Sequence, residues 1–322
     1  MRRSFRISHI GLLGSAPLVH ALATGAFERE GMQCELHHEI GDFTVLDRLL
    51  DGSIDALCAP ATLSLAHGLA GRDSAIDWFV HTLITRSGFG LVLATGAGEI
   101  LHASGTRPLP TLRIGVPMGA TSAPLLVKRW HAERASTGLP EPKCLQVPLS
   151  QLFDFLTENV IDGFCVGDPL PAIAVGRGLG EIVATSESLA PDHPHTVLLS
   201  PAFSPLCSPA NRRALARALG PSLEYCADPA NRDAVVRLGL AMIPPRVLAR
   251  ADSDRLHARG PHGLAALFST RFAAPHFPAT LSTGDRSFLE ESVLIAMGTS
   301  GRRAQVRARI DRSFPGTLAS TG

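Results

Sequence analysis

The sequence carries two copies of one segment, and this repeat restricts the chain to folds that contain two similar units. A constant shift places residues 6–72 on residues 113–179 without a gap and gives fourteen identities. The clearest matches are the pattern ID-x-x-C and the tetrapeptide SAPL, which begins at Ser15 and again at Ser122. Because equal offsets require elements of equal length, we expect the two copies to have the same strand order.

Within each copy, short apolar runs alternate with stretches of helical spacing. In the first copy, residues 5–13, 33–40 and 54–59 have the character of buried strands, and residues 16–30 and 43–50 that of helices. Strands that alternate with helices form parallel βαβ units. The sequence therefore predicts an α/β protein with two lobes, each built around one copy.

Residues 78–95, which lie between the two copies, are strand-like. We expect such segments outside the copies to join the two lobes and to act as a hinge. From residue 208 onward the pattern is helical, which predicts a helical C-terminal section. The expected division is lobe one at residues 1–95 and 200–300, lobe two at residues 110–195, and a flexible basic tail at residues 301–322.

Composition argues against several classes of partner. A formal net charge of +1 and an aromatic content of 5% give no support for a nucleic-acid surface. No apolar run reaches the ~18–20 residues that cross a bilayer, so no membrane insertion is expected. The chain has a basic start, but Ser15, Pro17 and His20 interrupt the apolar stretch that a signal peptide would need. We expect an unprocessed cytoplasmic chain, or a periplasmic one if the sequence is already trimmed.

Candidate binding residues stand at the starts of helices in both copies. Ligands of parallel α/β units collect beyond the carboxyl ends of the strands, where free amides and the helix dipole suit a small anion. Each such residue could instead be a simple helix cap, but the recurrence in both copies favours a cleft. The residues expected to line one cleft between the lobes are Ser15, Phe43, Pro60, Thr121, Ser122 and Asp168.

Enzyme signatures such as GxSxG, HExxH and a P-loop do not occur in the sequence. The histidines at residues 37–38 and 193–195 lack a third clustered ligand in sequence, so ordinary strand-end histidines are favoured over a metal site. Asp55 and Asp162 fall at equivalent strand starts, where turn residues are common. We therefore expect no catalytic residue, no cofactor and no metal.

Three stretches resemble the nitrate- and bicarbonate-binding solute receptors of ABC transporters and the cytoplasmic nitrate sensors related to them. They are APLVHALATGAFEREGM at residues 16–32, LLDGSIDALCAP at residues 49–60 and IDGFCVGDPLPAIAVGRGLGEIVATSESLAPDHPHTVLL at residues 161–199. The last stretch follows the family pattern I-D-G-x-C-V-G-E-P…G-x-G-x-I-x-A-T nearly in order. The resemblance implies a type II periplasmic-binding-protein, or Venus-flytrap, fold.

The chain departs from this family at several positions of the implied ligand site. Phe43 stands where the family usually has Trp, Ala123 where it has His, Asp168 where it has Glu and Leu170 where it has Trp. A family Gln close to Pro60 has no counterpart. Losing the His and the Gln removes donors that would replace water around an anion. We therefore expect nitrate to bind weakly, and bicarbonate or a small neutral or zwitterionic molecule to bind better.

The resemblance implies a protein that binds a small solute, an anion of the nitrate or bicarbonate kind. Such a protein would serve an ABC permease, or it would act as a cytosolic nitrate-responsive sensor with a regulatory partner. Two alternatives remain open, because fold alone does not fix function. One is a biosynthetic enzyme on the flytrap fold, and the other is a ligand-free interaction protein. A catalytic site would need an ionisable pair in the cleft, and Asp168 is the only strong candidate for such a group, which favours binding over catalysis.

Overall fold

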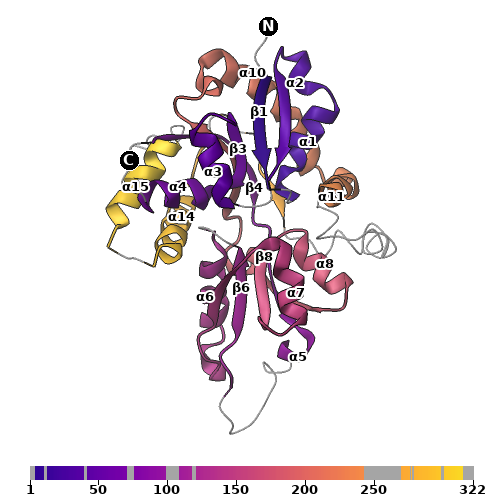
Figure 1. Ribbon diagram of the computed structural model, residues 1–322, viewed down its shortest axis with the longest axis vertical. Helices are drawn as coiled ribbons and strands as arrows, with labels where there is room; N and C mark the ends of the chain where they lie inside the picture. Colours follow the sequence, from indigo (N-terminus) through magenta and orange to yellow (C-terminus); the bar gives the residue numbers. More distant parts are fainter. Residues whose placement is uncertain are drawn as a thin grey trace.

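Two β-sheets divide the protein into an upper and a lower lobe, as Figure 1 shows. The computed structural model describes residues 4–10, 13–39, 42–70, 76–98, 109–117, 121–242, 270–275, 277, 279–298 and 301–314. None of the helices in these ranges is long and apolar enough to cross a membrane.

The sheet of lobe one has the order β11-β4-β10-β3-β1-β2 over the described strands. Its strands are β1 (Ser4–His9), β2 (Gln33–His38), β3 (Ala56–Pro60), β4 (Trp78–Arg86), β10 (Pro194–Pro201) and β11 (Arg271–Phe272). Strand β1 pairs in parallel with β2 and β3, whereas β10 runs antiparallel to β3 and β4.

The sheet of lobe two has the order β7-β6-β8-β5-β9. Its strands are β5 (Phe89–Ala94), β6 (Arg113–Pro117), β7 (Lys143–Val147), β8 (Gly163–Gly167) and β9 (Gly180–Thr185). Strand β6 pairs in parallel with β7 and β8, β8 runs antiparallel to β5, and β5 runs antiparallel to β9. The two repeated segments therefore have the same strand order, which confirms the duplicated βαβ units.

Helices cover both faces of each sheet in the same way. In lobe one, α1 (Ala16–Ala23) packs on one face, and α3 (Asp42–Leu50) and α4 (Ala61–Ala70) pack on the other. Helix α6 (Ala123–Ala132) takes the place of α1 in lobe two, and α7 (Leu152–Thr157) and α8 (Leu170–Gly176) take the places of α3 and α4. Short helices α2 (Ala26–Arg29), α5 (Thr95–Gly98) and α9 (Ser186–Leu189) complete the two lobes.

A pair of equivalent Arg–Asp contacts fixes the edge of each sheet opposite the helix starts. The backbone amide of Arg6 donates to the Asp55 carboxylate at 2.9 Å, and that of Arg113 donates to Asp162 at 2.7 Å. Each guanidinium also reaches a backbone carbonyl, that of Gly52 at 2.6 Å for Arg6. Both aspartates therefore have a structural role that goes beyond forming a turn. Arg6 and Arg113 fall on equivalent positions of the two repeats, and this match was the sequence signal for the two Arg–Asp contacts.

Helices from the C-terminal part of the chain pack on lobe one, and some of them also share buried clusters with lobe two. They are α10 (Pro209–Ala227), α11 (Arg232–Ala241), α14 (Thr283–Ala296) and α15 (Arg303–Ser313). Helix α10 lies against α1, and α11 contacts the turn just before α1. Helix α14 touches α4 of lobe one and also α6 of lobe two, so it bridges the lobes (Figure 1).

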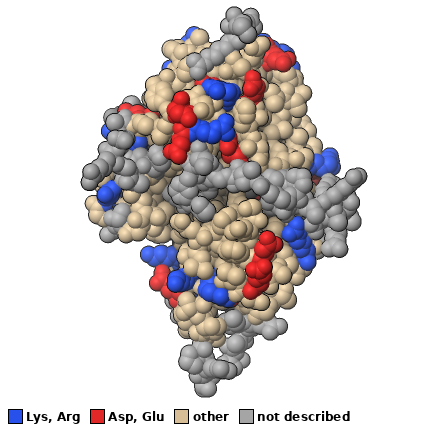
Figure 2. All heavy atoms as spheres, viewed as in Figure 1, with Lys and Arg blue, Asp and Glu red and all other residues tan. Residues whose placement is uncertain are grey.

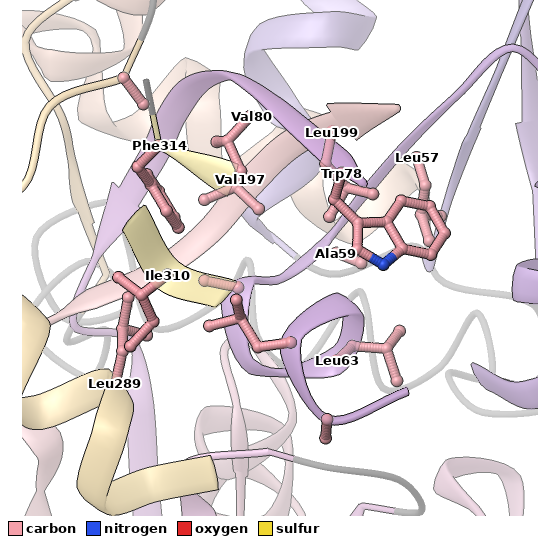
Figure 3. Packing of buried hydrophobic residues seen from close by; sticks show 14 of the residues in the cluster. Leu57, Ala59, Leu63, Trp78, Val80, Val197, Leu199, Leu289, Ile310 and Phe314 are labelled. Atoms are coloured by element: carbon pink, nitrogen blue, oxygen red, sulfur yellow. The ribbon is translucent and has the colours of Figure 1, made fainter. Parts of the chain in front are cut away.

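The prediction of a flexible tail over residues 301–322 is wrong for residues 301–314. This segment contains α15, and its side chains Val306, Ile310 and Phe314 are buried in the core of lobe one. Figure 3 shows Ile310 and Phe314 beside Val80 and Val197 of the central strands. Apolar residues four apart form one face of a helix, and burial of this face holds the segment in place. Residues 315–322 lie outside the described part of the chain.

The chain crosses from one lobe to the other twice. Neither crossing falls at the expected boundaries, which were residues 95, 110, 195 and 200. Strand β5 belongs to the second sheet, so the first crossing lies at Ser87 and Gly88. Strand β10 belongs to the first sheet, so the return crossing ends before Pro194. The two crossings touch, since the Ser87 amide donates to the His193 carbonyl at 2.9 Å.

Charged side chains form small mixed groups on the face drawn in Figure 2, with acidic and basic residues as neighbours on both lobes. This mixture agrees with the net charge of +1. All six cysteines are free thiols, and Cys58 and its equivalent Cys165 are buried. Burial raises the pKa of the Cys58 thiol to about 12, as expected for a small core residue.

Candidate functional site

The two lobes meet where strands of both sheets end and the next helices begin. The amide of Leu13, in the turn between β1 and α1, donates to the backbone carbonyl of Asp168 at 3.1 Å. Asp168 follows the carboxyl end of β8 in lobe two. Leu13 also shares a buried apolar cluster with Leu170 of α8. These contacts place one helix start of each copy against the other across the lobe boundary.

Asp168 is the polar centre of this junction. The residue is 3% exposed, and its carboxylate accepts hydrogen bonds from the amide and the hydroxyl of Thr270, both at 2.7 Å. Its own amide donates to the carbonyl of Gly88 in the first crossing at 2.8 Å. Asp168 therefore ties lobe two to the hinge and to the segment before β11. Neither Thr270 nor Gly88 was among the predicted site residues.

Ser15 and Pro60 lie on the lobe-one side of the same junction. A side chain at Gly14 would place its Cβ 2.6 Å from the Thr196 hydroxyl oxygen, so only glycine fits there. Thr196 in turn pairs with Pro60 in the register of β10 and β3. Ser15 is buried, and its hydroxyl contacts the Cys58 thiol. Ser15, Pro60 and Asp168 are thus connected through neighbouring contacts.

Thr121 and Ser122 precede α6, at the carboxyl edge of the second sheet that Asp168 also occupies. Both are buried, at 4% and 3% exposure. The Thr121 hydroxyl accepts a long bond from the Ala123 amide, at 3.4 Å. Ser122 makes no side-chain capping bond to the described residues of α6. Helices α6 and α8 pack on opposite faces of the sheet, so Thr121 and Asp168 approach its edge from two sides.

Phe43 is the second residue of α3. Its side chain lies outside the described part of the structure. Of the six predicted residues, the structure therefore links Ser15, Pro60 and Asp168 by contacts and puts Thr121 and Ser122 on the same sheet edge.

Several histidines also lie near the junction between the lobes. His9 ends β1 and lies opposite His38 in the register of β2, with 5.4 Å between the ring centres. Burial, together with His38, lowers the pKa of His9 to about 4, so the ring is neutral at pH 7. His193 of the return crossing and His195 of β10 are also buried. The described residues contain no group of three or more side chains that could hold a metal ion.

Hydrogen bonds that the sequence did not reveal hold the two crossings in place. The Ser186 hydroxyl accepts from the amides of Gly88 and Phe89, both at 3.0 Å, and the Ser87 hydroxyl donates to Glu187 at 2.6 Å. Gly88 has φ +115°, a conformation that side-chain-bearing residues rarely adopt. These bonds link the first crossing to α9 and the return crossing. A rotation of one lobe relative to the other therefore has to rearrange these hydrogen bonds.

Comparison with known proteins identifies the family. The model of the NMT1-like family matches residues 2–241, most of the chain. The chain belongs to the NMT1-like family. A relative of this NMT1-like chain is the nitrate import ATP-binding protein NrtC of Synechocystis sp., 27% identical over 71% of the chain and 36% of the relative. The chain thus spans about a third of the length of that relative.

Solved structures show the same architecture. The ligand-binding component of an ABC-type import system from Staphylococcus aureus, determined with zinc bound, matches 92% of both chains with a TM-score of 0.70 at 14% identity. The periplasmic nitrate-binding protein NrtA from Synechocystis matches 97% of this chain and 86% of its own with a TM-score of 0.68 at 18% identity. This NMT1-like chain therefore has the periplasmic-binding-protein fold, and the predicted fold class is confirmed.

Proposed function

We propose that the protein is a solute receptor that encloses one small molecule between its lobes. The observation that carries this proposal is the paired arrangement of helix starts, with Leu13 before α1 bonded to Asp168 before α8 across the lobe boundary. Helix starts present unpaired amides and a partial positive charge, which suit polar or anionic groups. The names of similar proteins support this reading, since NrtA is a nitrate-binding protein.

The ligand is proposed to be small and to carry its own hydrogen-bond donor. Asp168 is buried at the lobe boundary, and a carboxylate repels an anion placed beside it in a region of low dielectric. The Thr121 and Ser122 hydroxyls supply the complementary donors and acceptors. Bicarbonate or a small neutral or zwitterionic molecule meets these requirements better than nitrate does, because nitrate has no proton to donate.

Isothermal titration calorimetry with nitrate, nitrite, bicarbonate and a panel of small zwitterions tests this function. We expect at least one donor-bearing ligand to bind more tightly than nitrate. The double variant Thr121→Ala, Asp168→Ala is expected to weaken that binding by roughly a hundredfold, since each lost polar contact is worth about 1–3 kcal/mol. Asp154→Ala, on the exposed side of α7 in the same lobe, serves as the control. Tight nitrate binding that survives the double substitution would place the site elsewhere.

We further propose that an ABC permease or a regulatory protein recognises the closed form, and that the chain acts in the cytoplasm. Six free thiols support that location, because reducing compartments keep cysteines unpaired. Cell fractionation with a tagged full-length protein tests the location. Recovery in a periplasmic fraction would contradict a cytoplasmic sensor and favour a transport receptor.

A further inference from the structure

Lobe one has a hollow, away from the lobe boundary, between β4 and the start of α10. Its volume is about 220 Å³. Its walls are formed by Phe79, His81, Pro209, Arg212, Arg213, Ala216 and Phe277. Phe79 and His81 lie near the start of β4, whereas the hinge follows its last residue. The hollow is therefore separate from the candidate site at the junction.

Two cations line this hollow without an acidic partner. Within the described part of the chain, neither Arg212 nor Arg213 forms an ion pair, whereas Arg217 of the same helix pairs with Glu30. Arg212 instead lies over the ring of Phe79, with its guanidinium carbon 5.1 Å from the ring centre. An unpaired guanidinium fork is well suited to a carboxylate or phosphate.

The position of these arginines works against the stability of α10. Helix α10 begins at Pro209 and has nineteen residues, so its first turns carry the positive end of the helix dipole. Cations there are unfavourable, and no acidic residue occurs in the first turn to offset them. Helix formation therefore does not explain the two arginines. The dipole and the side chains together make the hollow attractive to an anion.

The remaining walls indicate the body of the ligand. Phe79 and Phe277 supply aromatic faces. His81 is 2% exposed, and one ring nitrogen contacts the Ser200 hydroxyl at 2.8 Å. Burial and the nearby Arg212 lower the pKa of His81 to about 3, so its ring is neutral at pH 7 and adds polar contact without charge. A bare inorganic anion would leave these aromatic walls unused.

We propose that this hollow is a second binding site, which takes a small aromatic carboxylate. Arg212 and Arg213 bind the carboxylate, and Phe79 and Phe277 contact the ring. The ligand class follows from the combination of an unpaired cationic pair with aromatic walls, and it does not depend on what the junction between the lobes binds.

Calorimetry or ligand-observed NMR with benzoate, benzamide and inorganic phosphate tests the site on the full chain. Benzoate is expected to bind roughly tenfold or more tightly than benzamide, which has the same ring without the charge. It should also bind more tightly than phosphate. Equal binding of benzoate and benzamide, or phosphate binding as tight as that of benzoate, would overturn the aromatic-carboxylate assignment.

Variants locate the binding. Arg212→Gln with Arg213→Gln is expected to weaken benzoate at least tenfold, and Ala216→Trp, which fills the hollow, is expected to abolish binding with both arginines present. Arg217→Gln lies one turn further along α10, outside the hollow, and should leave benzoate affinity unchanged. The Thr121→Ala, Asp168→Ala protein should also bind benzoate normally. Benzoate affinity that is unchanged in the arginine variants but lost in the Thr121→Ala, Asp168→Ala protein would show that benzoate occupies the lobe junction.

Discussion

Asp168 is a buried carboxylate whose hydrogen bonds to Thr270 join two distant parts of the chain. Asp168→Ala would remove the acceptor for two buried donors, and each unsatisfied donor costs about 1–3 kcal/mol. We expect urea denaturation to show a free energy of unfolding lower by roughly 2–4 kcal/mol. Asp47→Ala, at an exposed position of α3, should change it by less than about 0.5 kcal/mol. A loss no larger than that of the control would mean that the Thr270 bonds contribute little.

The sequence led to Asp168 but not to its partner, and the reason is physical. Asp168 stands at a recognisable junction, directly after a buried strand of a repeated unit. Thr270 lies 102 residues further on and outside any repeat or periodic pattern. No local propensity reports such a contact, because it depends on how the C-terminal segment packs back on the lobes. The hinge bonds of Ser186 were hidden for the same reason.

Among the elements, α14 has the clearest mechanical role, since it contacts both lobes. Phe288 packs against lobe two, with its ring 4.5 Å from that of His193 and the Arg129 guanidinium 5.4 Å from its centre. The neighbouring Leu289 points into the core of lobe one instead (Figure 3). An ion pair between Arg129 and Glu291, at 2.9 Å, adds to the attachment.

Adjacent substitutions in α14 should therefore affect different lobes. Phe288→Ala is expected to destabilise the contact with α6, at a cost of about 3–5 kcal/mol for a buried phenylalanine, and to speed hydrogen exchange of α6 amides at least tenfold. Leu289→Ala should instead speed exchange around α4 and α15. Hydrogen exchange with mass spectrometry separates the two patterns. Identical patterns for both variants would contradict a bridging role.

Element prediction succeeded where the pattern was strong. The strands predicted over residues 5–13, 33–40 and 54–59 match β1, β2 and β3 within a few residues, and β3 is a continuous buried run, as is typical of a central parallel strand. Helix α15 was missed because its charged residues dominate the composition. Its apolar positions Val306 and Ile310, with Phe314 just after its end, recur every four residues, which was a usable helical signal.

At the scale of the whole molecule, buried histidines should make stability depend on pH. Burial lowers the pKa of His9 and His193 to about 4 and that of His81 and His195 to about 3. The unfolded chain binds these protons near pH 6.5. Between pH 6.5 and about 4 the unfolded state thus holds more protons, so stability falls as the pH decreases.

The expected loss is about 1.4 kcal/mol per pH unit for each of these histidines. Urea denaturation at pH 7, 6 and 5 measures this loss. His193→Phe should reduce the slope of the free energy of unfolding against pH by about 1.4 kcal/mol per pH unit. A free energy of unfolding that stays constant between pH 7 and pH 5 would show that the rings take up protons in the folded state at the same pH as in the unfolded chain.

The placement of β10 sets the order in which the lobes can be completed during synthesis. This strand lies between β3 and β4 in the first sheet but follows both lobe-two crossings in the chain. Until residues 194–201 leave the ribosome, β3 and β4 lack their shared neighbour, whereas the described strands of lobe two all lie within residues 89–185. The lobe that starts the chain therefore finishes folding last, and its open strand edges need protection from other chains in that interval.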